Sequence, residues 1–470
     1  MTEILLIIPP SPEERFCVRD KGAMGYSKAG YIFPPYDMIS IAAFLREKGF
    51  DLKLIDANAN KLNLRTVEKV IKENKPKFVI FSNSTPTIHF DLNIAKICKK
   101  LNKKIVTVTF GPHIVSLGKE VLKSCLELDY GIVNEYELTI LDILKRKSDK
   151  KIKGIFYRIR KEIIDNGKRE SLENLDTLPF PAHDLLNLKL YQFPYSARKP
   201  VAATMTTRGC PNKCIFCQTV LTWKKFKARS CKHVMDEIKF LCNKLKVKEI
   251  KFWDDNFTYD EKRVIDLCDE ILKEKLKFGW IVNARVDKIS EKMLRKMKKA
   301  GCHTICFGVE SGDEEVLKSV GKELTLSQIR SGFKLAKKVG LKTLGFFMIG
   351  HPKDTKKTIN KTINFAKELN PDMASFNIVV PFPGTPLFTI ARHKNWIKTF
   401  DWSKYESTSY PVYTPPNLTR KEIYALFKKS YREFYFRPSF VLNRLINLKN
   451  FDALKKDLKS MFGLIKMLIG

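Results

Sequence analysis

Two long stretches of this sequence alternate short apolar segments with amphipathic ones, and this alternation limits the folds open to the chain. The first stretch ends near residue 146. Its apolar segments lie at 4–8, 52–55, 78–81 and 105–110, and its helix-like segments at 38–48, 66–73, 91–101, 117–125 and 135–145. Strands separated by helices of about ten residues pair in parallel, because a parallel crossover needs that length. We therefore predict a doubly wound, Rossmann-like α/β domain over residues 1–150.

The second stretch, from Val201 to about Ile390, repeats the alternation with six expected strands, at 203–207, 249–253, 279–284, 304–309, 343–349 and 375–380. Six such units suit a partial (β/α)6 barrel of the TIM type, whose functional residues lie at the carboxyl ends of the strands. We assign this barrel to residues 200–395. Residues 151–199 are expected to form a connector with a hairpin, and residues 396–470 a helical C-terminal region.

A cysteine cluster follows the first strand of the predicted barrel. Cys210, Cys214 and Cys217 have C-x3-C-x2-C spacing. Three thiolates on so short a loop can bind three irons of a [4Fe-4S] cluster, because soft sulfur ligands suit iron-sulfur chemistry. The alternative is a non-catalytic scaffold with a zinc site, in which Cys231 or His233 completes four ligands.

The chain is strongly basic, with 86 Lys and Arg against 51 Asp and Glu, a net charge of +35. The basic residues are spread along the chain with no arginine-rich tail. We therefore rank three explanations of the positive charge: a lysine-rich proteome first, binding to an anionic membrane surface second and binding to nucleic acid last. The sequence has no signal-like N-terminus and no span of about eighteen apolar residues. We expect a cytoplasmic protein, in which the 11 cysteines stay reduced.

The carboxyl ends of the N-terminal strands lead into loops that are candidates for ligand binding. They contain Ser84 and Thr85, the turn Gly111-Pro112-His113, and Glu135. Glycine and small hydroxyl residues let a large flat ligand approach the backbone.

The ends of the later barrel strands carry further polar residues and glycines, in Trp253-Asp254-Asp255-Asn256-Phe257, Asn283-Ala284-Arg285-Val286-Asp287, Gly308-Val309-Glu310-Ser311-Gly312 and Met348-Ile349-Gly350-His351-Pro352. Together with the cysteine cluster and the aromatic Phe216, this series resembles the cobalamin (B12)-binding domain-containing radical SAM family. The Gly111-Pro112-His113 turn matches the cobalamin-binding domain of that family, and Val133-Asn134-Glu135-Tyr136-Glu137 is a partial match.

The resemblance implies three cofactors. A [4Fe-4S] cluster would be held by Cys210, Cys214 and Cys217, S-adenosylmethionine would bind at its open iron, and cobalamin would bind the N-terminal domain. The D-x-H-x-x-G motif that supplies a cobalt ligand in B12 methyltransferases is absent from the loop after the first strand. Cobalamin is therefore expected without a histidine axial ligand, and a Rossmann-like scaffold that has lost its cofactor is the alternative.

The resemblance also suggests roles for single residues. Asp254, Asp255 and Asn256 occupy the position that meets the methionine amino group, and Glu310 the position of a ribose or methionine contact. Arg285 would hold the carboxylate of S-adenosylmethionine or a substrate anion; an internal salt bridge with one of these acids is the alternative. Gly350 is placed near the adenine. Cobalamin contacts are expected from Ser84, Thr85, Gly111, Pro112, His113 and Glu135; no catalytic side chain is predicted.

By the same resemblance, the protein is expected to be an enzyme that abstracts hydrogen from an unactivated carbon. Cobalamin-dependent C-methylation, or carbon-carbon bond or ring formation, would follow on a lipid or tetrapyrrole-like substrate, with ferredoxin or flavodoxin as electron donor. The competing enzyme class is a methylthiotransferase acting on tRNA. That class needs a second cluster, and Cys17, Cys98 and Cys125 lack the spacing for one.

The last 30 residues repeat apolar residues at helical spacing among lysines. We expect either a helix packed on the barrel or an amphipathic helix on an anionic membrane surface. The stripe consists of Leu442, Leu445, Ile446, Phe451, Leu454, Leu458, Phe462 and Ile465.

Overall fold

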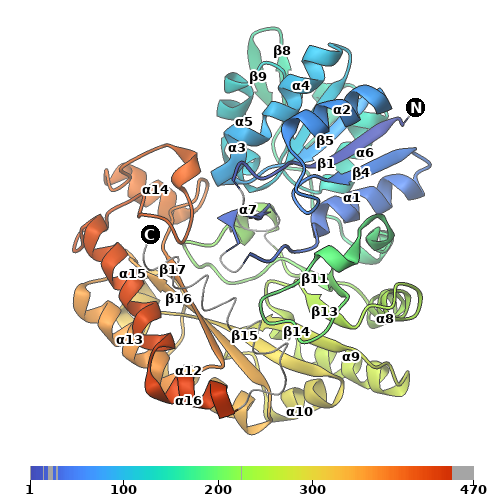
Figure 1. Ribbon diagram of the computed structural model, residues 1–470. Helices are drawn as coiled ribbons and strands as arrows, with labels where there is room; N and C mark the ends of the chain where they lie inside the picture. Colours follow the sequence, from blue (N-terminus) through green and yellow to red (C-terminus); the bar gives the residue numbers. More distant parts are fainter. Residues whose placement is uncertain (1, 14, 20–24, 28–29, 224, 447–470) are drawn as a thin grey trace.

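The computed structural model describes residues 2–446 except 14, 20–24, 28–29 and 224 (Figure 1). Two α/β parts lie against each other, an N-terminal part drawn in blue and a barrel drawn from green to orange. Among the described residues, no helix is long and apolar enough to cross a membrane. Most of the predicted stripe at the C-terminus, from Phe451 onward, lies outside the described residues.

The N-terminal part is a seven-stranded sheet in the order β4-β1-β5-β6-β7-β8-β9. Its five parallel strands are β1 (Ile4–Ile8), β4 (Leu52–Asp56), β5 (Phe78–Ser82), β6 (Val106–Phe110) and β7 (Tyr130–Ile132). The hairpin expected in the connector is formed by β8 (Ile155–Ile159) and β9 (Glu162–Asp165), but it pairs antiparallel with β7 and extends this sheet. The unpaired edge of β7 is thereby covered.

Helices cover both faces of this sheet, as a doubly wound fold requires. One apolar core joins the sheet to α1 (Tyr36–Glu47) and α6 (Tyr136–Leu144). The other joins it to α2 (Leu64–Asn74), α4 (Asn93–Leu101) and α5 (Pro112–Ser124). Two short helices, η1 (Thr85–Thr87) and α3 (Ile88–Asp91), follow β5, and a small ribbon of β2 (Cys17–Val18) and β3 (Gly25–Tyr26) lies in the loop after β1.

The barrel has six parallel strands in chain order, which confirms the predicted (β/α)6 architecture. They are β10 (Val201–Thr204), β13 (Glu249–Phe252), β14 (Gly279–Ala284), β15 (Cys302–Glu310), β16 (Lys342–Ile349) and β17 (Met373–Ile378). The outer layer consists of α8 (Cys231–Lys239) with its π-helical extension Phe240–Lys244, α9 (Glu261–Lys273), α10 (Glu291–Lys299), α11 (Glu314–Ser319), α12 (Leu326–Lys338) and α13 (Lys356–Leu369).

Side-chain caps fix where the barrel helices begin. Asp260, Ser290, Thr325 and Thr355 each accept a hydrogen bond from the backbone N–H three residues later. Such caps satisfy backbone donors that a helix leaves unpaired, and each contributes about 1 kcal/mol. The starts of these helices also set the lengths of the loops that leave the carboxyl ends of the strands.

The connector contains three short 3-10 turns, Leu175–Thr177, His183–Leu185 and Leu188–Leu190, and ends beneath the barrel. Glu249, on β13, is buried and accepts hydrogen bonds from the backbone N–H groups of Ala197 and Arg198. A buried carboxylate with several donors is a stable anchor because its charge is compensated. The connector is thereby attached to the start of the barrel sheet.

The C-terminal region packs on both parts. It contains α14 (Pro386–His393), the turn η8 (Trp402–Lys404), α15 (Arg420–Tyr435) and α16 (Pro438–Ile446). On α15, the Tyr431 hydroxyl donates to the carbonyl of Phe376 on β17 at 3.0 Å, so this helix closes the barrel edge. Trp402 instead reaches the N-terminal domain, where its ring lies 5.1 Å from that of His113.

We predict that Gly118→Ala will destabilise the N-terminal domain. A Cβ atom at this position of α5 would overlap the ring of Phe156 on β8. Alanine normally stabilises a helix relative to glycine, but overpacking here should lower the free energy of unfolding by about 1–3 kcal/mol. Thermal or chemical unfolding measures the change. Lys119→Ala, at the exposed next position, is the control and should change stability by less than about 0.5 kcal/mol.

Candidate cluster and cofactor site

The cysteine cluster lies on the loop between β11 (Thr207–Arg208) and α7 (Thr219–Thr222), just after the first barrel strand. β11 pairs antiparallel with β12 (Lys227–Ala228). Gly209 begins the loop with φ +87°, and a side chain there would overlap the carbonyl of Lys225. Glycine is therefore required where the chain turns into the cysteines.

The loop after α11 packs against the cysteine loop. The N–H of Ile215 donates to the carbonyl of Val320 at 3.1 Å, and the Cys214 thiol lies 3.7 Å from the carbonyl of Gly321. A side chain at Gly321 would lie 2.9 Å from the carbonyl of Lys213. The segment after α11 is thus connected to the cysteine loop through a close approach of two backbones.

The donor set of this loop fits a [4Fe-4S] cluster. Cys214 is buried, whereas Cys210 and Cys217 are partly exposed. The thiols are close enough to interact electrostatically, Cys217 with Cys214 and Cys210 with Cys217. Burial raises the pKa of the Cys214 thiol to about 11; iron binding would displace that proton. Three soft sulfur donors can hold three irons, with one iron left open for another ligand.

The residues considered as further zinc ligands have other partners. Cys231 lies against the carbonyl of Arg263, and His233 contacts Arg229 and Asp176. In the described part of the chain, no three His, Cys, Asp or Glu side chains surround a common metal position. The same holds for Cys210, Cys214 and Cys217, so their assignment depends on donor chemistry and spacing. Cys17, Cys98 and Cys125 form no second group either.

Asp254, Asp255 and Asn256 follow β13 and lie beside the cysteine loop. The Oδ1 atom of Asp254 accepts hydrogen bonds from the backbone N–H and hydroxyl groups of both Thr206 and Thr207, just before that loop. Asp254 therefore holds the start of the cysteine loop, a role the sequence did not predict. Its Oδ2 and the Asn256 Nδ2 are buried without a hydrogen-bond partner in the described structure. Both atoms remain available to a ligand.

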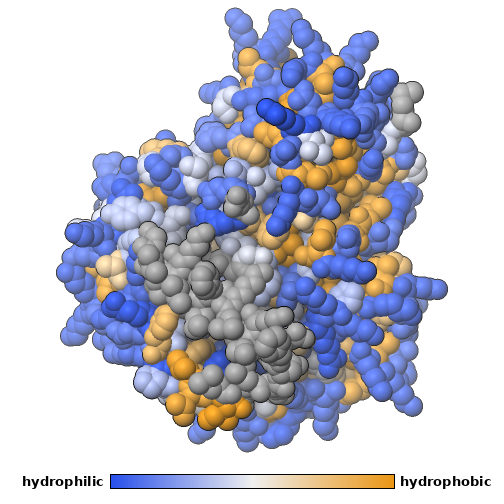
Figure 2. Space-filling model, viewed as in Figure 1, coloured by the Kyte–Doolittle hydropathy of each residue, from blue (hydrophilic) through white to orange (hydrophobic). Residues whose placement is uncertain are grey.

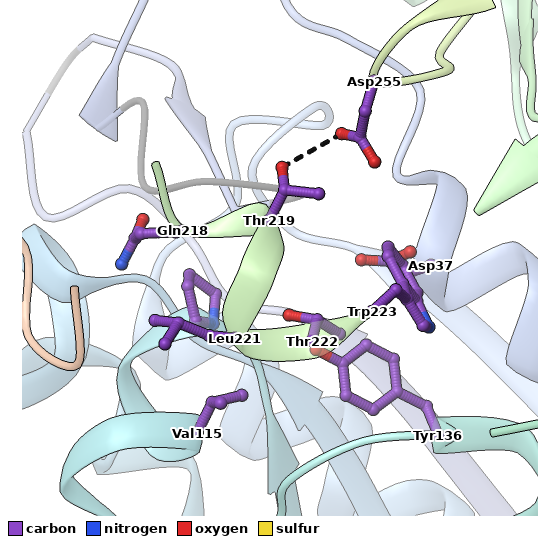
Figure 3. A pocket seen from close by; sticks show the side chains of 10 residues that line it. Asp37, Val115, Tyr136, Gln218, Thr219, Leu221, Thr222, Trp223 and Asp255 are labelled. Carbon is purple, nitrogen blue, oxygen red and sulfur yellow. Dashed lines mark hydrogen bonds between the residues drawn. The ribbon is translucent and has the colours of Figure 1, made fainter. Parts of the chain in front are cut away.

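Asp255 faces the other end of the cysteine loop. Its Oδ1 accepts a hydrogen bond from the Thr219 hydroxyl at 3.1 Å, two residues after Cys217 (Figure 3). Asp254 and Asp255 thus contact the cysteine loop before and after its thiols. The predicted contact of these residues with a methionine amino group stays a prediction.

Glu310 lies beside Cys214 together with a lysine that the sequence did not single out. The Lys322 ammonium donates to Glu310 Oε1 at 3.0 Å, and both side chains are buried. Gly308 makes room for this pair, because a Cβ atom there would lie 2.8 Å from the Lys322 Nζ atom. The charges of Lys322, Glu310 and Arg285 all act on the Cys214 thiol.

Arg285 forms an internal salt bridge, but not with the acids considered for it. Its Nε and Nη2 atoms donate to the carboxylate of Asp287 at 2.9 and 3.2 Å, and Nη2 also donates to the carbonyl of Lys322. The partner is set by the bend after β14, which brings Asp287 back beside the guanidinium. An anion-binding role for Arg285 would have to coexist with this pair.

Gly350 and His351 follow β16. Gly350 has φ +98°, and a side chain there would point at Ile423 of α15, 3.3 Å away. Backbone conformation therefore accounts for this glycine, and its predicted place near an adenine stays a prediction. The N–H groups of Gly350 and His351 both donate to Asp354 Oδ2. This turn holds the His351 ring 5.6 Å from the ring of Phe216.

The predicted cobalamin residues after β5 and β6 meet at one edge of the N-terminal sheet. Ser84, Thr85 and His113 are all buried, and the His113 Nδ1 lies 3.3 Å from the Thr85 hydroxyl. Gly111 has φ +141°, and a side chain there would overlap the carbonyl of Asn83. Burial lowers the pKa of His113 to about 3, so its ring is neutral. This edge can bring backbone and small hydroxyl groups to a flat ligand.

Glu135 pairs with an arginine of the barrel part, and its predicted contact with cobalamin stays a prediction. It has φ +47°, and its Oε2 lies 3.5 Å from Arg208, two residues before Cys210. Arg208 also binds Glu137 at 2.5 Å, and the Ser40 hydroxyl donates to Glu137. Burial raises the pKa of Glu137, but Arg208 more than offsets it and the pKa lies below its usual value. We call Arg208, Glu135 and Glu137 the interdomain clamp.

An open pocket lies between the two parts beside the cysteine loop, with a volume of about 440 Å³ when the solvent-open space is included (Figure 3). Pro112, Val115 and Tyr136 line it from the N-terminal domain. Gln218, Thr219, Leu221, Thr222 and Trp223 line it from the segment after Cys217, with Asp255 at its end. The pocket therefore connects the predicted cobalamin edge with the predicted cluster loop.

Comparison with known proteins agrees with this arrangement. The family model of the radical SAM superfamily matches residues 204–366, and that of the B12 binding domain matches residues 24–144. The "uncharacterized methyltransferase PH0819" of Pyrococcus horikoshii is 34% identical over 454 residues, 96% of each chain. The chain belongs to the cobalamin-binding radical SAM family. The predicted fold, cofactors and enzyme class are thereby confirmed.

The chain is also similar to a cyclase and to two solved structures. The anaerobic magnesium-protoporphyrin IX monomethyl ester cyclase of Rubrivivax gelatinosus is 29% identical over 420 residues, covering 87% of this chain and 75% of the cyclase. The structure of TsrM from Kitasatospora setae matches with TM-score 0.72 and 13% identity over 98% of this chain and 99% of TsrM. OxsB matches with TM-score 0.75 and 15% identity over 99% of this chain and 72% of OxsB. These structural likenesses support the fold.

We predict that Arg208→Met will destabilise the protein by about 3–5 kcal/mol, because it leaves two buried carboxylates without their cation. Adding Glu135→Gln and Glu137→Gln should recover a large part of this loss. Chemical denaturation followed by tryptophan fluorescence measures both.

The matched control is Arg330→Met, which removes the half-exposed pair of Arg330 and Glu368 and should cost at most about 1 kcal/mol. Equal effects of the two arginine substitutions would show that the clamp is no stronger than a surface pair.

Proposed function

We propose that this protein uses radical chemistry to methylate an unactivated carbon of a small molecule, or to close a ring on one. The observation that carries the proposal is the pocket shared by the cysteine loop and the predicted cobalamin edge. A substrate in this pocket would contact both cofactor regions at once. The methyltransferase of P. horikoshii and the cyclase of R. gelatinosus support these two outcomes.

When bound, the cluster supplies one electron that cleaves S-adenosylmethionine to methionine and a 5'-deoxyadenosyl radical, and cobalamin supplies the methyl group or a second redox centre. The protein's own part is to position and enclose these reactants. Cys210, Cys214 and Cys217 would hold the cluster, and Asp254 and Asp255 fix their loop. The interdomain clamp then sets the distance between the loop and the N-terminal edge.

The charged groups near Cys214 suit the amino-acid end of S-adenosylmethionine. The free Oδ2 of Asp254 can accept from its ammonium, and the side chains of Arg285 and Lys322, although paired with Asp287 and Glu310, can attract its carboxylate. Glu310 is already paired with Lys322, so a ribose contact would use its second oxygen. Among the described residues, His113 faces Thr85 and Trp402, so we propose cobalamin binding without a histidine axial ligand.

We propose an apolar substrate of the lipid or tetrapyrrole kind and a small electron-transfer protein, ferredoxin or flavodoxin, as reductant. We do not propose methylthio transfer, because Cys17, Cys98 and Cys125 lack the spacing for the second cluster that this activity needs.

The function is tested with protein purified anaerobically in the presence of cobalamin. We expect about four irons per chain, bound corrinoid, and 5'-deoxyadenosine on reduction with S-adenosylmethionine. Cys214→Ala should abolish 5'-deoxyadenosine formation, because the cluster loses a ligand. Cys242→Ala, in the π-helical extension of α8 and away from the loop, is the control and should keep it. About eight irons would contradict the single-cluster assignment, and no corrinoid with an intact cluster would contradict cobalamin binding.

We also propose that this enzyme is cytoplasmic and contacts anionic membranes through its C-terminal region. On α16, Val441, Leu442 and Ile446 are 42%, 60% and 72% exposed, and Phe436 just before the helix is 45% exposed. Figure 2 shows hydrophobic surface at the lower edge of the barrel, in the region of this helix. Apolar side chains next to Arg437 and Arg444 suit an anionic lipid surface.

Flotation with vesicles that contain anionic lipid tests the membrane contact. The double variant Leu442→Glu, Ile446→Glu should reduce binding at least several-fold. Each change replaces an apolar side chain that contacts the lipid acyl chains with a carboxylate that the anionic lipid headgroups repel. Leu126→Glu, at a residue 73% exposed in the N-terminal domain, is the control and should leave binding unchanged. Undiminished binding of the α16 double variant would contradict the proposal.

A further inference from the structure

The inner face of the barrel sheet is partly exposed, although its outer face is buried. Successive side chains of a strand point to opposite faces. On β14 to β16, the outward residues Val282, Phe307 and Phe347 pack in the core beneath the helices. The inward residues that are partly exposed are Asn283, Gly308, Phe346, Met348, Met373, Ser375 and Asn377. Side chains normally fill the interior of a parallel barrel, so this interior is unusually open to a ligand.

Lys251 on β13 brings a positive charge into this interior. Its neighbours Ile250 and Phe252 pack in the core outside the sheet, so the Lys251 side chain lies on the inner face. In the parallel register Lys251 is opposite Ile281, yet its ammonium donates to Asn283 Oδ1 at 2.7 Å, two residues closer to the carboxyl ends of the strands. The side chain therefore extends toward the partly exposed part of the interior.

No carboxylate pairs with the Lys251 ammonium among the described residues. The side chain is fully buried, and the Asn283 oxygen is its hydrogen-bond acceptor there. Burial lowers the pKa of Lys251, and Cys306 and Asp254 offset this only in part. Apart from Arg263 on α9, the other buried cations of the described chain form salt bridges: Arg19, Arg208, Arg229, Arg285 and Lys322. Because lysine is almost never fully buried without a partner, an anion is expected beside Lys251.

The contacts of Lys251 limit what this anion can be. The Nζ atom lies 5.5 Å from the centre of the Tyr195 ring, which packs with the apolar cluster of Ile281, Cys306 and Leu344. One ammonium beside one amide matches the single charge of a carboxylate, whereas a more highly charged phosphate would need further donors. The anion is therefore expected to be a carboxylate on an apolar molecule.

Lys251 lies deeper in the barrel than the charged groups that suit S-adenosylmethionine. Asp254 follows β13 and Glu310 is the last residue of β15, whereas Lys251 lies within β13, three residues before Asp254. The place of the expected anion is therefore separate from the charges near the cysteine loop. An elongated molecule that lies along the strands can contact both regions.

We propose that Lys251 binds a carboxylate of the substrate inside the barrel and thereby makes the enzyme specific for apolar acids. The inference rests on the proposed function, because it narrows the apolar substrate proposed there to one that carries a carboxylate. With this group held by Lys251, the apolar remainder extends toward the carboxyl ends of the strands, where the cysteine loop lies. Lys251 is thus a specificity-determining residue and takes no part in hydrogen abstraction.

The test compares acids with their neutral amides, which match them in shape. Anaerobic calorimetry measures the binding of octanoate and octanamide, and of phenylpropanoate and phenylpropanamide, to the full-length enzyme with its cluster. Acetate is a further probe, because it offers the carboxylate without an apolar body. None of these measurements depends on turnover.

We expect wild-type protein to bind at least one of the two larger acids about tenfold more tightly than its amide, because the acid forms a charge-assisted hydrogen bond. Lys251→Met, which keeps the apolar stem and removes the charge, should bind acid and amide equally, and Lys251→Arg should keep part of the preference. Lys248→Met, at an exposed lysine just before β13, is the control and should behave as wild type. Iron content and thermal unfolding verify that each variant is intact.

The inference is overturned if Lys251→Met with normal iron content prefers the acids as wild type does. It is also overturned if wild-type protein binds neither larger acid more tightly than its amide, or binds acetate as tightly as both, results that need no variant to fold. Formation of 5'-deoxyadenosine tests the proposed function separately. If it is absent while the acid preference depends on Lys251, the proposed function fails and the acid site remains.

Discussion

The buried ion pair between Arg208 and Glu137 is the interaction on which the arrangement of the whole molecule depends. Arg208 stands two residues before the first cysteine, and Glu137 begins the last helix of the N-terminal domain. A pair buried this deeply gives little net stability but penalises any arrangement that separates its members. Arg208 is the last residue of β11, which leads directly into the cysteine loop. The position of this loop is therefore coupled to the relative position of the two parts.

Three further contacts from two segments of the barrel hold the same loop. Asp254 and Asp255, after β13, form hydrogen bonds before and after its cysteines, and the segment at Gly321, after α11, makes a close backbone contact with it. The barrel and the interdomain clamp therefore both fix the position of the loop. Such redundancy suits a site that must hold reactants at fixed distances.

Much of the fold follows from the sequence, because hydrophobic periodicity is a local property. The strand at 279–284 is found with both ends correct, and the six barrel strands occur in the predicted order. The hairpin at 155–165 was also foreseen, but not the sheet that it joins, since edge pairing is decided by distant residues. The strand at Tyr130–Ile132 was not predicted, because three residues are too few to show a period.

The site was less predictable, for a related reason. The cysteines and Asp254 to Asn256 are recognisable by spacing, whereas the roles of Arg208, Lys322 and Lys251 depend on partners far along the chain. Glu135 was singled out from its place in a turn, and only the folded structure brings Arg208 to it. Arg285 was correctly considered for an internal pair, but its partner, Asp287, depends on how the chain bends after β14.

The packing of the C-terminal region on the N-terminal domain has a consequence for biosynthesis. Trp402 lies against His113, and Glu406 reaches Arg15, so the predicted cobalamin edge receives its cover from residues made long after it. A ribosome that has just released the first domain presents this edge uncovered. Insertion of a large cofactor before the last quarter of the chain emerges would not be obstructed by Trp402 or Glu406, and completion of translation would then add this part of the cover.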